Sequence, residues 1–403
     1  MLREEIAIET MPVGPLGIIA LKGCEELAAK VDYYLATWRK DRDSIHKGSL
    51  TLAGYEKDSY LIKAQTPRFG SGEAKGIINE SVRGKDLFIM VDVCNNSLEY
   101  RMSGFTNHMS PDDHFQDLKR IIAAIGGKAR RITVIMPFLY ESRQHKRTGR
   151  ESLDCALGLE ELYNMGVENV ITFDAHDPRV INCAPLKGFE NVKPSYQFLK
   201  YLCKNVPGLK FDKDHMIMIS PDEGAMDRSV FYSSVLGIDM GMFYKRRDYS
   251  TIVNGSNPIV AHEYLGTDIS GKDAIIVDDM ISSGGSMLDT ARAVKALGAK
   301  NIFIFSTFGL FTNGMEKFDK AYEEGYFTKV LTTNLTYQSP ELLKRPYYIS
   351  VDMSKYVAYI IDSLNHDISI SDLLTPSKKM TALIENYHAG RYPEKKDADG
   401  SEN

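Results

Sequence analysis

The sequence predicts an α/β protein with two domains, each built around a parallel sheet. Short apolar runs that suit buried strands alternate with segments of helical spacing, and this alternation occurs in both halves of the chain. The total of 403 residues is long enough for two domains with substantial cores. Residues 274–277 form the clearest strand, and they run through an acidic pair and a small-residue loop directly into a helix. That order of features is typical of a ligand site in an open α/β sheet.

The N-terminal half begins with a strand followed by a helix. Residues 17–21 are apolar, and Leu27, Val31 and Leu35 recur at helical spacing within residues 24–36. The same patterns predict strands at residues 87–93, 132–136 and 170–174, helices at residues 115–125 and 153–165, and a long polar loop at residues 95–113.

The C-terminal half repeats the scheme. The patterns predict strands at residues 216–219, 241–243, 274–277 and 302–305, and helices at residues 194–203, 226–236, 287–297 and 354–364. A proline-bearing stretch at residues 184–196 joins the two halves. We therefore expect a domain at residues 1–190, a second domain at residues 191–374, and a flexible polar tail at residues 375–403.

Composition excludes several classes of protein. With 43% hydrophobic and 26% charged residues, the chain is typical of soluble globular proteins, and no run reaches the roughly 18 apolar residues of a membrane helix. The N-terminus carries acids and no long apolar core, which argues against a secretory signal. A net charge of −5 does not favour nucleic acid, and the five cysteines are scattered without a Cys-x-x-Cys pair. We expect a cytoplasmic protein with reduced cysteines.

Residues 278–286 predict a site for the phosphate and hydroxyl groups of a sugar. Asp278 and Asp279 follow the apolar run, at the end of the strand where parallel sheets bind ligands. The next loop lacks bulky side chains, so its amides and hydroxyls can surround a phosphate at the start of a helix; its residues are Ser282, Ser283, Gly284, Gly285 and Ser286. The alternative is an ordinary strand-to-helix turn.

Further clusters of polar and charged residues occur along the chain, and all but the one at Phe69 follow predicted strands. Lys245, Arg246 and Arg247 are consecutive cations that suit a mobile loop over polyphosphate, although such a run is also common in solvated turns. His176 and Asp222 suit a metal or phosphate, with Asp222 a hard oxygen ligand for Mg²⁺, while His176 alone is more often a packed turn histidine. The segments beginning at Pro137 and Phe69 gather aromatic, polar and charged groups, and are weak signals by themselves.

Taken in order, these motifs are similar to those of the ribose-phosphate diphosphokinase family, from about residue 17 to residue 374. The motifs are Phe69-Gly-Ser-Gly-Glu73, Asn79-Glu-Ser-Val-Arg-Gly84, Arg143-Gln144, Asp174-Ala-His176, Ser220-Pro-Asp222, Lys245-Arg-Arg247 and Val277-Asp-Asp-Met280. Simple phosphoribosyltransferases share the last motif but have a single such domain and lack the Lys-x-Arg segment. The resemblance therefore implies two phosphoribosyltransferase-like domains of type I.

The resemblance also implies an activity and roles for these residues. It implies transfer of the diphosphoryl group of ATP to ribose 5-phosphate with Mg²⁺, in a homo-oligomer built from dimers and often a hexamer. For ATP, the resemblance implies that Phe69, Ser71 and Glu73 border the adenine from a neighbouring subunit, that Arg143 and Gln144 contact the nucleotide, and that His176 and Asp222 serve the metal and polyphosphate. It implies that Lys245 and Arg247 are catalytic. For the sugar, it implies that Asp278 and Asp279 hold the ribose and that the 5-phosphate is held by the loop of Ser282, Ser283, Gly284, Gly285 and Ser286.

Some positions depart from the family pattern. Ser282 and Ser283 replace an acid and a threonine, His145 replaces an acid after Arg-Gln, and Tyr244 replaces an acid before the basic segment. The chain is also longer, at residues 1–16, around residues 40–60 and 95–115, and after residue 374. These departures leave open a different 5-substituted ribose as acceptor, and an inactive regulatory homologue.

Overall fold

The computed structural model describes residues 10–45, 55–247 and 259–392 and divides the chain into two compact α/β units. Unit 1 comprises Met1–Lys193, Asn334–Tyr337 and Asp352–Thr375, and unit 2 comprises Pro194–Thr333, Gln338–Val351 and Pro376–Asn403. The chain first passes from unit 1 to unit 2 after Lys193, close to the predicted domain boundary at residue 190. Residues 334–337 and 352–375, however, were expected in the C-terminal domain and belong to unit 1.

Unit 1 contains a five-stranded parallel sheet with the order β1-β4-β7-β8-β9. Its strands are β1 (Leu16–Ala20), β4 (Asp86–Met90), β7 (Arg131–Ile135), β8 (Asn169–Phe173) and β9 (Gly188–Val192). Apolar residues follow Asp86 in β4 and make up most of β7 and β8, as expected for strands buried on both faces. Two antiparallel pairs stand apart from this sheet: β2 (Ala64–Gln65) with β3 (Ile77–Ile78), and β5 (Glu99–Met102) with β6 (Phe105–His108).

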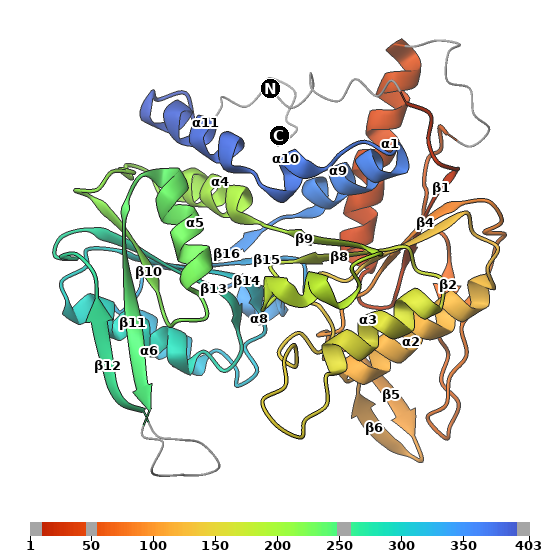
Figure 1. Cartoon of the computed structure of the whole chain (residues 1–403), viewed down its shortest axis with the longest axis horizontal. Coiled ribbons are helices and arrows are strands. Elements are labelled where there is room, and N and C mark those ends of the chain that lie inside the picture. Colours follow the sequence, from red (N-terminus) through yellow and green to blue (C-terminus); the bar gives the residue numbers. More distant parts are fainter. Residues whose placement is uncertain (1–9, 46–54, 248–258, 393–403) are drawn as a thin grey trace. The chain divides into compact units, whose positions relative to one another are not determined.

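The helices of unit 1 form two groups (Figure 1). The ion pair between Lys119 and Glu161, at 2.8 Å, joins α2 to α3, and the stacked rings of Trp38 and Tyr359, with centroids 4.3 Å apart, join α1 to α9. The helices are α1 (Glu25–Ile45), α2 (Pro111–Ile125), α3 (Asp154–Asn164), α9 (Ser354–Asn365) and α10 (Ser371–Leu374), with a 3-10 helix at Pro178–Cys183. The long loop predicted at residues 95–113 was wrong, because it contains β5, β6 and the start of α2.

Unit 2 contains a seven-stranded sheet with the order β12-β11-β10-β13-β14-β15-β16. Its strands are β10 (Met216–Ser220), β11 (Asp239–Arg247), β12 (Ile259–Leu265), β13 (Asp273–Ile281), β14 (Ile302–Gly309), β15 (Lys329–Thr333) and β16 (Tyr348–Val351). Only β12, the edge strand, pairs antiparallel among these. The prediction of parallel sheets is therefore confirmed, apart from this added edge.

Helices cover both faces of the unit 2 sheet, and β14 is therefore buried along its whole length. Phe305 stacks on Phe198 of one helix, and Ile304 belongs to a separate cluster with Met287 and Phe318. The helices are α4 (Ser195–Asn205), α5 (Met226–Leu236), α6 (Gly285–Ala296), α7 (Glu316–Glu323), α8 (Pro340–Leu343) and α11 (Ser377–His388).

Helix α11 corrects the prediction of a flexible tail from residue 375. Met380, Leu383 and Ile384 are buried, and the Tyr387 hydroxyl accepts a hydrogen bond of 3.0 Å from the Leu209 amide in unit 2. Residues 393–403 lie outside the described residues. Among the helices that the structure describes, none has the length and apolar character needed to cross a bilayer.

A buried charge network fixes α9 to α1 in unit 1. Asp362 is fully buried and pairs with Arg39, whose Nη2 lies 3.3 Å from Oδ1, and with Arg42. The same Nη2 donates to Asn365 Oδ1 at 2.7 Å. Burial alone would raise the pKa of the Asp362 carboxyl, but the charges of Arg42 and Arg39 outweigh it and hold that pKa below its usual value. These long-range contacts explain why residues 352–375 return to unit 1.

A second link ties residues 334–337 to the same unit. Asp92 is buried just after β4, and its carboxylate accepts from the amides of Cys94, at 2.9 Å, and Tyr337, at 2.7 Å. Burial raises the pKa of Asp92 to about 7, although both hydrogen bonds act to lower it.

We expect Asp362→Ala to lower the free energy of unfolding of unit 1 by about 3–5 kcal/mol, because it leaves two guanidinium groups with an unpaired buried charge. Trp38 is the single tryptophan of the chain and stacks on α9, so its fluorescence during urea unfolding reports this unit. The matched control is Asp367→Asn, which removes the charge but keeps a residue that tolerates the left-handed φ of 51° at this position. Asp367 pairs with Arg131 at 2.9 Å but is 70% exposed, so the loss of its charge should cost less than about 1 kcal/mol. Equal losses in the two variants would contradict the role given to the buried network.

We expect Asp92→Asn to change the pH dependence of stability. Because the folded pKa of about 7 lies above the unfolded value of about 4, Asp92 keeps its proton in the native state, and its contribution is lost as the pH rises from about 4 to about 7. The asparagine lacks this titration. The variant should therefore gain up to about 4 kcal/mol relative to the wild type over that range. The measurement is Trp38-monitored unfolding at a series of pH values, and parallel curves would refute the assignment.

Candidate functional site

The strand order of unit 2 reverses between β10 and β13. From β10 the chain proceeds to β11 and β12 on one side, and from β13 it proceeds to β14, β15 and β16 on the other. In open α/β sheets the crevice at the carboxyl ends of two such strands is the usual ligand site, because the following loops diverge there.

Asp278 and Asp279 lie at this edge. The pairing of β10 with β13 ends at Ile219 and Ile276, whereas β13 continues beside β14 as far as Ile281. The acidic pair thus lies inside the strand, just beyond the part that β10 covers. Burial raises the pKa of the Asp278 carboxyl well above its usual range, and the charge of Asp279 raises it further. Asp279 is buried and Asp278 is half-buried, and such a pair of acids favours a ligand that brings hydroxyl donors or a cation.

Asp222 and Arg228 act on the same carboxyl. Asp222 raises the pKa of Asp278 and Arg228 lowers it, which places both groups within electrostatic reach of the pair. Asp222 follows β10, and its Oδ1 accepts from the amides of Gly224, at 3.0 Å, and Ala225, at 3.3 Å, in the turn before α5. Sequence reasoning missed Arg228. Its position in the first turn of the helix after Asp222 was the available signal, because that turn starts at the same edge of the sheet.

The small-residue loop after β13 leads into α6 as predicted for an anion site. Gly284 is the N-cap residue with φ of 79°, a left-handed conformation that suits glycine, and no side chain caps the helix. A Cβ at Gly284 would lie 2.2 Å from the Phe318 ring, so glycine is also required by packing. The amides of the first helical turn have no acceptors within the helix and carry its positive dipole end. Ser283 and Ser286 are exposed beside them.

The basic segment lies in a strand and not in the loop that we predicted. β11 extends through Arg247 and pairs with β12, with Lys245 opposite His262 and Arg247 opposite Ile259. β11 is the neighbour of β10, so this strand continues from the edge that carries Asp222. The structure describes the backbone of Lys245 and Arg247 but not their side chains, and residues 248–258 lie outside the described residues.

In unit 1, the loops after β7 and β8 bring several predicted residues together. Gln144 donates from Nε2 to the Ser152 carbonyl at 2.8 Å, beside exposed Arg143. The next residue, His145, lies between the two loops: its ring centroid is 5.5 Å from that of His176, and its Nε2 is 3.1 Å from the Asp177 carboxylate. His145, noted in the sequence only as a departure, is thus the structural link between Gln144 and His176.

Phe69, Ser71 and Glu73 lie in the loop between β2 and β3, and all three are exposed. The loop is closed on itself, because the Phe69 amide donates to the Glu73 carbonyl at 2.7 Å and the Ser71 hydroxyl donates to the Glu73 carboxylate at 2.8 Å. It therefore presents one aromatic ring, one hydroxyl and one carboxylate outward.

Comparison with known proteins identifies the family. The model of the N-terminal domain of ribose phosphate pyrophosphokinase matches residues 16–166, and that of the phosphoribosyl synthetase-associated domain matches residues 256–375. The ribose-phosphate pyrophosphokinase of Vibrio parahaemolyticus is 28% identical over 320 residues, covering 77% of this chain and 90% of that protein. Ribose-phosphate pyrophosphokinase A of Dictyostelium discoideum is 26% identical over 326 residues, covering 79% and 92%.

A solved structure supports the fold independently. The phosphoribosylpyrophosphate synthetase of Mycobacterium smegmatis superposes with a TM-score of 0.66 at 22% identity, covering 88% of this chain and 99% of that one. Its fold confirms the prediction of two phosphoribosyltransferase-like domains. Since the two family models occur in order and together match more than half of the residues, this chain belongs to the ribose-phosphate pyrophosphokinase family.

Proposed function

We propose that this enzyme transfers the diphosphoryl group of ATP to the anomeric hydroxyl of ribose 5-phosphate, giving 5-phosphoribosyl 1-diphosphate and AMP. The observation that carries the proposal is the edge of unit 2 where half-buried Asp278 and buried Asp279 lie next to an uncapped helix start with a glycine N-cap. The family of the chain supports the same conclusion. The enzyme acts as a homo-oligomer built from dimers, up to a hexamer.

The sugar phosphate is held by β13 and the loop after it. Asp278 and Asp279 accept hydrogen bonds from the ribose hydroxyls, which offsets the cost of placing two partly desolvated carboxylates side by side. The amides at the start of α6, with the hydroxyls of Ser282, Ser283 and Ser286, surround the 5-phosphate at Gly284 and Gly285. A phosphate seated there also meets the positive end of the helix dipole.

ATP is held by unit 1 residues from two subunits. Arg143, Gln144 and His176 contact the nucleotide and its phosphates from the loops after β7 and β8. Phe69, Ser71 and Glu73 border the adenine of a neighbouring subunit. Their exposure supports this arrangement, because side chains that serve another subunit's site must be accessible on their own.

The residues present fit a magnesium ion carried with the nucleotide. Among the described residues no group of three His, Cys, Asp or Glu side chains forms a metal cluster, but Mg²⁺ commonly uses one or two carboxylates together with substrate phosphates. Asp222 and His176 would serve it, and the excess negative charge that raises the pKa of Asp278 suits a nearby cation. When bound, the ion would neutralise charge on the polyphosphate.

The chemistry depends on positioning and charge. The anomeric hydroxyl attacks the β-phosphorus, the bond to the α-phosphate oxygen breaks, and AMP leaves with the electron pair. Lys245 and Arg247 stabilise the oxygens on which negative charge accumulates, and we assign no general base.

The decisive experiment incubates purified enzyme with ATP, Mg²⁺ and ribose 5-phosphate and follows AMP, with products identified by mass spectrometry. Release of AMP together with 5-phosphoribosyl 1-diphosphate is the expected result. Turnover of another 5-substituted ribose in preference to ribose 5-phosphate would identify a different acceptor. Absence of AMP with every acceptor would leave an inactive homologue.

We expect Lys245→Ala to lower kcat at least about 100-fold, because a cation that stabilises only the transition state is lost. The thermal midpoint should change little. The matched control is Lys320→Ala on α7, where the lysine is 75% exposed beside Glu324, and kcat should stay at the wild-type value. Near-normal turnover of Lys245→Ala would show that the segment does not act in catalysis.

We expect Gly284→Ala to raise the KM for ribose 5-phosphate at least about tenfold, because alanine is strained at φ of 79° and its methyl group meets Phe318. The KM for ATP should change much less. Gly149→Ala in unit 1 is the matched comparison, since a methyl group there meets nothing within 4 Å, φ is not positive and the residue lies outside the sugar-phosphate loop. If Gly149→Ala raised this KM as much as Gly284→Ala, the loop conformation would not be the cause.

A further inference from the structure

The β5–β6 hairpin is an antiparallel element of unit 1 that stands apart from its five-stranded sheet. Its strands pair from Glu99 with His108 to Met102 with Phe105. The two turn residues, Ser103 and Gly104, have φ of 51° and 88°, as a tight two-residue hairpin turn requires. The segment is therefore a built hairpin whose register is fixed by its turn.

The two faces of the hairpin differ. Tyr100, Met102 and Asn107 share one face and are half-buried, although Phe105 at the end of the same face is 74% exposed. Arg101 and Thr106 form a cross-strand pair on the opposite, exposed face. The half-buried residues of the first face contact another part of unit 1.

That part is the loop between β2 and β3. The Ser103 amide donates to the Gly70 carbonyl at 2.9 Å. A Cβ added at Gly72 would lie 2.5 Å from the Met102 sulfur, so the methionine lies directly against the backbone of this glycine. The hairpin thus contacts the loop at two of the residues between Phe69 and Glu73.

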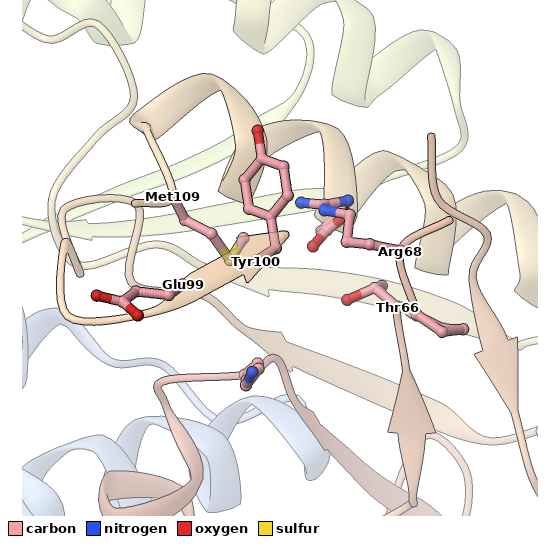
Figure 2. A pocket seen from close by; sticks show the side chains of 8 residues that line it. Thr66, Arg68, Glu99, Tyr100 and Met109 are labelled. Carbon is pink, nitrogen blue, oxygen red and sulfur yellow. Dashed lines mark hydrogen bonds and ion pairs between the residues drawn. The ribbon is translucent and has the colours of Figure 1, made fainter. Parts of the chain in front are cut away.

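Arg68, at the start of the loop, is held from two sides. Its guanidinium carbon lies 5.0 Å from the centre of the Tyr100 ring, and its Nη1 donates to Asp117 of α2 at 2.6 Å. Figure 2 shows Arg68 and Thr66 opposite Glu99, Tyr100 and Met109 around a cavity of about 240 Å³. Because this space is not filled by side chains, the loop has room to shift if Tyr100 is removed.

We propose that the β5–β6 hairpin positions the nucleotide-binding loop, with Tyr100 and Met102 as positioning residues that set the affinity for the base of ATP. The inference rests on the proposed function. Arg68 and Gly72 are half-buried against the hairpin and the Gly70 carbonyl accepts from it, while the side chains of Phe69, Ser71 and Glu73 are exposed. The hairpin therefore supports the inner side of the loop and leaves the outer side to the ligand.

The expected change in ATP affinity follows from the fraction of molecules in which the loop between β2 and β3 has its binding conformation. The apparent dissociation constant for ATP equals the intrinsic one divided by the fraction of loops in the binding conformation. If the loss of both side chains lowers this fraction to about one tenth, apparent affinity falls about tenfold. The transfer step takes place at the phosphates and the anomeric carbon, so kcat at saturating ATP should not change.

The test measures AMP formation by full-length wild type and by the double variant Tyr100→Ala, Met102→Ala. We expect the KM for ATP to rise about tenfold, with kcat and the KM for ribose 5-phosphate within about twofold of wild type. Tyr100→Phe, which keeps the ring over Arg68, should retain the wild-type KM. The double variant Arg101→Ala, Thr106→Ala on the outer face should also retain it.

An unchanged KM for ATP, or a fall in kcat without a rise in that KM, would overturn the inference. A general loss of folding is recognised by a lower apparent kcat at unchanged KM values and by a lower thermal midpoint, and also counts against it. If the wild type forms no AMP, the proposed function fails and calorimetric titration with ATP decides the inference separately. Binding that is about tenfold weaker in the inner-face variant supports it, and equal or absent binding in both proteins refutes it.

Discussion

The placement of two adjacent carboxylates, one buried and one half-buried, where β10 and β13 diverge is the constraint on which the rest of unit 2 depends. Asp278 and Asp279 lie past the end of the β10 pairing, in a position where burial and mutual repulsion both oppose their charged forms. Such an arrangement is unfavourable for folding and persists because the topology fixes it. Arg228, which lies on α5, offsets part of the repulsion between Asp278 and Asp279, and a bound sugar or cation would offset more. Stability and function therefore conflict at this edge, as is common in binding sites.

The strong signals in the sequence were those that need only local patterns. The apolar runs of β4, β7, β8 and β13 predicted buried parallel strands, and the change from Asp279 through Gly284 predicted a strand, loop and helix in the right order. What the sequence could not predict depended on distant partners. Helix α9 belongs to unit 1 because Asp362 meets Arg39, a pair separated by more than 300 residues.

Two other misses have local causes. The β5–β6 hairpin has the turn Ser103-Gly104, a weaker signal than Asn-Gly, and one of its faces is exposed and polar, so its strands are read as a loop. The basic segment reads as a loop because Lys245 and Arg247 are charged, yet they continue β11 by pairing with β12, which the sequence reaches only after residue 258. In both cases the pairing partner, and not the residue type, decides the structure.

The replacement of an acid by serine at the sugar-phosphate loop is consistent with this charge balance. The charges of Asp279 and Asp222 already act on Asp278 and raise its pKa. Another carboxylate, at residue 282, would add repulsion close to the place proposed for a phosphate. A serine hydroxyl retains a hydrogen-bond donor without that charge. The loop geometry itself does not depend on the missing acid, because the left-handed Gly284 and the ring of Phe318 beneath it set the entry into α6. The departure therefore changes the electrostatics of the site while its backbone frame is preserved.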